Sequence, residues 1–183
     1  MTLARSRKGV LNDYNAAPAQ VQKFFVHLPK LLDDLSLDVS LSYVFSQVEL
    51  AQNLTLYCGI VKLHRADSTL ARTAIDTHHM SRGDFKQKFE AVFGKPIPEK
   101  IGKLLETAEA TRDRVMHGKS TTEKEKRQAL VDVLQYAREF NELVVSLASF
   151  RPFGELRGFK GRAKPLDKST TRWLLKGMGF SIS

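Results

Sequence analysis

The sequence contains a single cysteine, Cys58, and no long apolar run among its 183 residues. One cysteine cannot form a disulfide within its own chain, which excludes a disulfide-stapled secreted domain and favours a reducing compartment. Cys58 lies on the apolar stripe of an expected helix and is interpreted as a core residue. The most apolar stretch, residues 143–150, is too short to cross a bilayer, and no apolar run follows the basic start of the chain. We therefore expect a cytoplasmic protein that does not span a membrane.

Acidic residues are in the minority, at 20 against 29 lysines and arginines, which gives a net charge of +9 and a pI near 9.7. This excess favours polyanionic partners. Residues 151–183 contain eight basic and two acidic side chains and so carry +6 of the net charge. The rest of the chain is nearly balanced. Its 42% hydrophobic and 27% charged residues are typical of one globular domain with its own core.

Apolar residues recur at spacings of three and four through most of the chain, the period of helices with one buried face. No segment alternates as a strand does, so the sequence predicts an all-α fold, an antiparallel helical bundle over residues 18–150. Residues 1–17 are expected to form a flexible basic arm, and residues 151–183 are expected to form a basic C-terminal extension with a short helix. The expected helices cover 18–35 with a kink at Pro29, 38–63, a short stretch within 64–80, 81–94, 98–118, 122–147 and 169–176.

Local signals mark several of these helix ends. Ser81 and Asp84 have the spacing of a capping box, in which each side chain accepts a hydrogen bond from the backbone of the other residue. Gly118 is placed to end the helix that precedes it, because glycine tolerates the left-handed conformation common at that position. Thr121 or Thr122 is expected to cap the last long helix.

The segment Arg112-Asp-Arg-Val-Met-His117-Gly lies late in one of the expected helices. On a helix, Arg112 and His117 are separated by about 140° of rotation, which would place them on opposite walls of a groove. Asp113 and His117 are four residues apart and therefore neighbours on the helix surface. We expect the Asp113 carboxylate to orient the imidazole.

These residue types are the ones that RNA cleavage without a metal requires. A base must remove the proton of a 2′-hydroxyl, an acid must protonate the departing 5′-oxygen, and a positive group must stabilise the charge on phosphate. Histidine titrates near neutrality and can serve in either proton transfer, whereas arginine offers a fixed fork of donors to phosphate oxygens. One copy of the motif supplies one histidine. The chemistry therefore favours a homodimer with two facing copies, and products that end in a 2′,3′-cyclic phosphate.

The motif and the helices around it, over residues 41–147, resemble a bacterial HEPN (higher eukaryotes and prokaryotes nucleotide-binding) domain. The signature of that family is an arginine, a polar residue and then a histidine near the end of a helix. The resemblance implies a helical homodimer that cuts RNA without a metal or cofactor, with Arg112, Asp113 and His117 as catalytic residues. It also implies a role as a toxin or in phage defence, with an antitoxin or other protein as a further partner. Some HEPN toxins carry a modified tyrosine two residues after the histidine, where this chain has Lys119.

Further cations beside the motif and in the extension are expected to contact RNA: Arg114, Lys119, Arg157, Lys160, Arg162, Lys164, Arg172 and Lys176. Phe153, Phe159 and Trp173 lie among the cations of the extension, a mixture typical of surfaces that hold single-stranded nucleic acid. The same aromatic side chains could instead dock the extension onto the bundle and leave the charges solvated. Both interpretations are open at this point.

Two other histidine-containing patterns compete with the motif. Arg72 and His78 have the same loose spacing, but Thr73 stands where an acidic, amide or histidine residue is expected. His64, His78 and His79 form a weak candidate for a zinc site, because adjacent histidines on a helix point about 100° apart and need other ligands to chelate one metal. The alternative interpretation of the histidine pair is a solvated surface.

The motif itself also has interpretations without catalysis. Arg112 could pair with Glu109 on a solvated helix end, where His117 would meet the negative end of the helix dipole. Glu49, on the expected helix 38–63, could instead face the site and position the arginine. The alternative function is a non-catalytic helical module that binds nucleic acid or regulates another protein.

Overall fold

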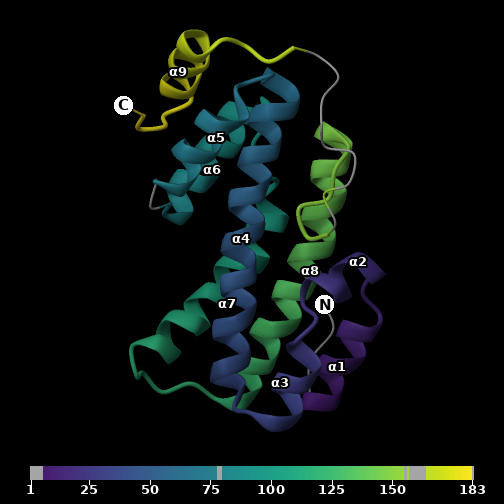
Figure 1. Cartoon of the computed structure of the whole chain (residues 1–183). Helices are drawn as coiled ribbons and strands as arrows, with labels where there is room; N and C mark the ends of the chain where they lie inside the picture. Colours follow the sequence, from purple (N-terminus) through teal and green to yellow (C-terminus); the bar gives the residue numbers. More distant parts are fainter. Residues whose placement is uncertain (1–5, 78–79, 155, 157–163, 183) are drawn as a thin grey trace. The chain divides into compact units, whose positions relative to one another are not determined.

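The computed structural model describes residues 6–77, 80–154, 156 and 164–182, and within them the chain is helical and contains no strand (Figure 1). The predicted all-α fold is confirmed. No helix in these ranges combines the length and the apolar character needed to cross a membrane. The helices are α1 (Arg7–Asn15), α2 (Ala19–Phe24), α3 (Leu28–Asp34), α4 (Leu37–His64), α5 (Ser68–Asp76), α6 (Arg82–Phe93), α7 (Glu99–Met116), α8 (Glu123–Ala148) and α9 (Lys168–Gly177).

Within the all-α fold, the helices group into two compact units. The first unit comprises Met1–Leu50, Pro98–Leu143 and Phe153–Glu155, and the second comprises Ala51–Ile97, Val144–Pro152 and Leu156–Ser183. The longest helices, α4 with 28 residues and α8 with 26, each contribute to both units. At 1.5 Å per residue, each is about 40 Å long, which is enough to support two separate apolar clusters along its length.

The N-terminal residues 7–15, expected to belong to a flexible arm, form helix α1 and pack against α3. The Ser6 hydroxyl caps this helix by accepting a hydrogen bond from the Gly9 N–H at 3.1 Å. Val10 and Tyr14, one turn apart, are buried, and the Arg7 guanidinium donates to the backbone carbonyl of Leu32 at 2.7 Å. Helix α1 has nine residues and two buried side chains, so its apolar stripe is too short to be recognised from periodicity in the sequence.

The segment expected as one helix kinked at Pro29 is divided into two helices. Helix α2 ends at Phe24 and α3 begins at Leu28, with Pro29 in its first turn. Proline is tolerated there because the first N–H groups of a helix have no partner within the helix. Proline therefore starts a second helix here and does not bend a continuous one.

Phe153, which the sequence placed in the basic extension, belongs to the core of the first unit. Its ring is fully buried and lies against four aromatic rings with centroids 5.3–6.3 Å away: Phe24, Phe25, Tyr136 and Phe140. The buried Asn141 amide bonds both backbone groups of Phe153, donating to its carbonyl at 3.0 Å and accepting from its N–H at 2.9 Å. For this aromatic residue, the docking interpretation is therefore correct.

We expect Asn141→Ala to lower the free energy of unfolding by about 2–4 kcal/mol, because the substitution leaves two backbone groups of a buried residue without partners. Urea unfolding followed by circular dichroism measures the change. Asn12→Ala, at an exposed position of α1, is the matched control and should be nearly neutral. Equal stability of the two variants would show that the Asn141 bonds do not hold Phe153 in place.

The second unit confirms the predicted start of α6 and the interpretation of Cys58. The Ser81 hydroxyl accepts from the Asp84 N–H, and the Asp84 carboxylate accepts from the Ser81 N–H, so the capping box is formed. Cys58 is fully buried, and this burial raises the pKa of its thiol to about 12. A thiol in this environment stays protonated and acts as a small apolar side chain.

Helix α9 lies beside α5 in the second unit, so the described part of the extension is packed against other helices (Figure 1). Leu175 and Phe180 are buried. The Thr171 hydroxyl accepts from the backbone N–H of Asp67 at 3.0 Å, and the Arg65 guanidinium donates to the Lys164 carbonyl. The extension after residue 163 is thus a structural part of its unit.

Candidate functional site

The motif histidine lies at the C-terminal end of α7, where the chain reverses direction. Gly118 has a φ of +66°, and its N–H bonds the Val115 carbonyl at 3.1 Å while the Lys119 N–H bonds the Arg114 carbonyl at 2.8 Å. This pair of hydrogen bonds is the Schellman arrangement that closes helices at glycine. His117 is therefore the C-cap residue of α7, and its side chain is exposed.

The Arg112 guanidinium is held against α4. It donates to the Glu49 carboxylate at 3.2 Å and to the Asp113 carboxylate at 2.9 Å, and its central carbon lies 5.3 Å from the centre of the Phe45 ring. The Arg112 side chain is 31% exposed. Glu49 thus positions the arginine, which is one of the interpretations that the sequence left open. Two acceptors occupy two of five N–H donors, so the guanidinium can still reach a further anion.

Asp113 does not contact His117 through its side chain in the way the four-residue spacing suggested. Its carboxylate is bonded to Arg112, and its link to His117 is a backbone one, from the His117 N–H to the Asp113 carbonyl at 3.0 Å. The difference arises because the helix ends at Met116, so His117 leaves the helical surface on which residues four apart are neighbours. Asp113 positions the arginine.

Arg114, expected to contact RNA, is engaged in an ion pair with Glu125 at 3.0 Å. Glu125 also accepts from the backbone N–H and the hydroxyl of Thr122, whose hydroxyl in turn accepts from the Glu125 N–H, so a capping box starts α8. These hydrogen bonds from Thr122, together with Arg114, lower the pKa of Glu125 to about 2. Lys119, in the connection between α7 and α8, is exposed.

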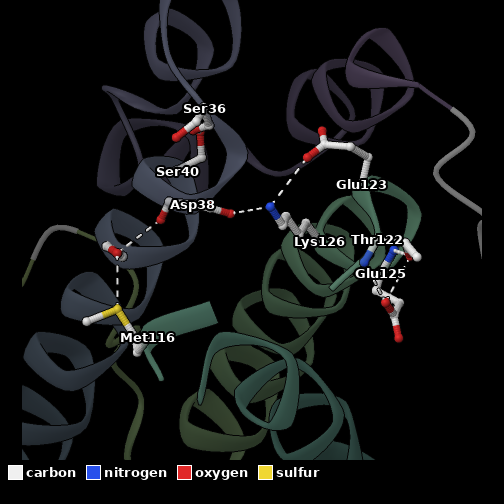
Figure 2. Close-up of polar contacts among 9 residues, drawn as sticks. Ser36, Asp38, Ser40, Met116, Thr122, Glu123, Glu125 and Lys126 are labelled. Atoms are coloured by element: carbon white, nitrogen blue, oxygen red, sulfur yellow. Dashed lines mark hydrogen bonds and ion pairs between the residues drawn. The ribbon is translucent and has the colours of Figure 1, made fainter. Parts of the chain in front are cut away.

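A lysine joins the start of α8 to the start of α4 (Figure 2). Lys126 Nζ lies 2.6 Å from Asp38 and 3.4 Å from Glu123, and the pairing with Asp38 raises the pKa of the lysine. The Ser42 hydroxyl donates to the Asp38 carbonyl at 3.0 Å and lies 3.8 Å from the sulfur of Met116, the last residue of α7. The ends of three helices therefore meet next to His117.

Glu125→Gln should destabilise the protein at neutral pH and much less at pH 3. The folded-state pKa of about 2 lies below the value of 4.5 that serves as the unfolded reference, so the stabilisation is present above pH 4.5 and is lost as the pH falls towards 2. Thermal unfolding of both proteins at pH 7 and pH 3 measures this. Glu99→Gln, at an exposed position of α7, controls for the loss of one surface carboxylate. A pH-independent difference for Glu125→Gln would contradict the assignment.

The described cations of the extension are on the surface, and Trp173 accompanies them. Lys164, Arg172 and Lys176 are exposed, and the Trp173 side chain is 77% exposed. An indole that protrudes from a helix among cations is available for stacking, unlike the buried Phe153. The other predicted contacts of the extension lie outside the described residues: Arg157, Phe159, Lys160 and Arg162.

The competing histidine patterns gain no support from the described residues. Arg72 lies over the Tyr57 ring and pairs with Asp76, while His78 and His79 lie outside the described ranges. His64 Nε2 is 2.7 Å from the Val92 carbonyl oxygen, which occupies one of its ring nitrogens.

Sequence reasoning missed one acidic residue, Asp132 on α8. Its side chain is buried and lines a cavity between α7 and α8 that also includes Arg114 and Glu125. Asp132 stands among the buried residues Leu130, Val133 and Leu134 of the apolar stripe. A charged residue inside an apolar stripe is the signal that could have identified it.

No protein-family model, curated protein or solved structure matches the chain. The proposed function therefore rests on the geometry of the chain's own residues.

Proposed function

We propose that the protein is a metal-independent endoribonuclease of the HEPN type that acts as a homodimer. The observation that supports this most directly is the pairing of an exposed histidine with an anchored arginine at the end of α7. His117 is accessible at the C-cap, and Arg112 is held over Phe45 by two carboxylates while keeping part of its surface exposed.

In the proposed reaction, Arg112 binds the scissile phosphate and His117 transfers a proton. The guanidinium is oriented in advance by Glu49 and Asp113, which lowers the cost of ordering it when a phosphate arrives. The proton accepted from the 2′-hydroxyl and the one given to the 5′-oxygen require two histidines, so the second copy supplies the other His117.

The exposed surface of α9 supports RNA recruitment and also the second candidate function, an RNA-binding module without catalysis. Trp173 offers a stacking face, and Arg172 and Lys176 offer charges for the backbone. In either case the α9 surface increases the affinity for RNA and takes no part in bond cleavage. The two candidates differ in whether His117 matters.

Purified protein in EDTA should cleave a mixed RNA pool and leave 2′,3′-cyclic phosphate ends. His117→Ala and Arg112→Ala should each reduce the rate of cleavage by at least about 100-fold, because the first removes the proton-transfer group and the second removes the phosphate contact. Product ends are identified by mass spectrometry of the fragments.

Two control variants accompany this experiment. His27→Ala removes another exposed histidine of the first unit, and Arg72→Ala removes the arginine of the competing pattern. Both should cut at the native rate. Cleavage that survives His117→Ala would overturn the nuclease assignment, and RNA binding without any cleavage would leave the binding module.

RNA affinity should depend on the α9 surface. Trp173→Ala is expected to weaken binding to a single-stranded oligonucleotide by about 1–3 kcal/mol. Arg172→Ala with Lys176→Ala should reduce the slope of log K against log salt by about 1–2, since each lost phosphate contact releases one counterion fewer. Fluorescence anisotropy at several salt concentrations measures both. Lys8→Ala with Lys30→Ala, at exposed positions of the first unit, is the matched control and should leave the slope unchanged.

A further inference from the structure

A groove of about 550 Å³ lies in the second unit, between α5 and the residues that follow α9. Its volume falls within the range of small-molecule sites, about 300–1,000 Å³. Arg112 and His117 belong to the first unit, so binding in this groove does not depend on the proposed cleavage chemistry. The described residues that line the groove are Thr73 and Thr77 of α5, Lys176 of α9, and Phe180, Ser181 and Ile182.

The two threonines of the groove present hydrogen-bond acceptors. The Thr73 hydroxyl donates to the Thr69 carbonyl at 3.0 Å, and the Thr77 hydroxyl donates to the Thr73 carbonyl at 2.7 Å. A hydroxyl has one hydrogen and two lone pairs, so each of these oxygen atoms, with its hydrogen directed to the helix backbone, accepts from a ligand. Both residues are exposed, and they are one helical turn apart, about 6 Å along α5. The groove therefore favours a ligand with hydroxyl donors.

The positive charge of the groove comes from Lys176. This residue is exposed, forms no ion pair with another described residue, and is the charged side chain among the described lining residues. Arg172 lies one turn earlier on the same face of α9 and is also exposed. An ammonium group has three donors and a compact charge, which favour a phosphate as its partner. Phe180 and Ile182 supply the apolar part of the wall.

We propose that this groove binds a ribose that carries a phosphate on O5′. The phosphate bonds Lys176, the 2′ and 3′ hydroxyls donate to Oγ1 of Thr73 and Thr77, and the base lies against Phe180 and Ile182. The 2′-hydroxyl is the donor that distinguishes ribose from deoxyribose. Two sources present this unit. One is a free 5′-ribonucleotide, and the other is the 3′-terminal nucleotide of an RNA strand whose earlier phosphates continue along the exposed surface of α9.

Isothermal titration of the full-length protein with adenosine 5′-monophosphate (AMP) tests the proposal from the side of the ligand. Saturable binding is expected. The 2′,3′-dideoxy analogue of AMP lacks both hydroxyl donors and adenosine lacks the phosphate, so each should bind at least about tenfold more weakly. These comparisons use the native protein, so a failure to fold cannot produce the difference.

Variants test the same contacts from the side of the protein. Thr73→Val with Thr77→Val removes both acceptors at nearly unchanged volume, so this variant should bind AMP as weakly as the native protein binds the dideoxy analogue. Lys176→Gln should bind AMP and adenosine equally. The matched controls are Thr69→Val and Lys168→Gln, at exposed positions of α5 and α9 outside the groove lining, and both should bind AMP as the native protein does. Circular dichroism establishes that each variant is folded.

A parallel titration with a hexanucleotide of adenosine distinguishes the two sources, with His117→Ala used to prevent cleavage. RNA binding that is lost when the 3′-terminal ribose lacks both hydroxyls assigns the groove to an RNA end, and AMP binding without it assigns the groove to a free ribonucleotide. The proposal is overturned if neither probe binds saturably, if the dideoxy forms bind equally well, or if the threonine and lysine variants bind unchanged. Because AMP binding requires no cleavage, failure of the proposed nuclease leaves this result intact.

Discussion

The left-handed backbone of Gly118 is the constraint on which the candidate site depends. Because the chain turns back at this residue, α7 ends at Met116 and His117 becomes an exposed C-cap residue beside the negative end of the helix. A Cβ atom added at position 118 would meet no neighbouring atom within 4 Å, so the requirement for glycine there is conformational and not steric. A helix that continued through this point would return His117 to the helical surface and displace the start of α8.

Charged side chains of the first unit hold the helix ends around that turn. Arg114 and Glu125 connect α7 with α8, Lys126 and Asp38 connect α8 with α4, and Arg112 is anchored to α4. A solvent-exposed ion pair contributes only about 0–1 kcal/mol, so the Arg114–Glu125 and Arg112–Glu49 pairs matter here more for position than for stability, whereas the Lys126 side chain is only 13% exposed. The cations of α9 belong to the second unit and face solvent. The proposed chemistry and the proposed recruitment of RNA thus depend on different groups of charges.

Most of the helical pattern could be predicted because its signals are local. The apolar period and the capping residues placed α4, α6, α7, α8 and α9 within two residues of their observed ends. The same signals placed His117 at the end of a helix before Gly118. Helix α1 could not be predicted because its apolar stripe is too short. The grouping of the helices into two units could not be predicted because apolar spacing does not show which helices share a core.

The sequence by itself determined the all-α class, the helix ends and the residue types of the motif, since each depends on interactions within a few positions of the chain. Tertiary structure decided what those residues contact. Glu49 anchors Arg112 from 63 positions away, and Asp113 pairs with Arg112 and leaves His117 to solvent. Gly59, an unfavourable residue inside a helix, is explained by the Val92 and Phe93 side chains, which would lie 2.6 and 2.7 Å from an added Cβ atom. Such contacts join residues distant in sequence, and packing in three dimensions selects them.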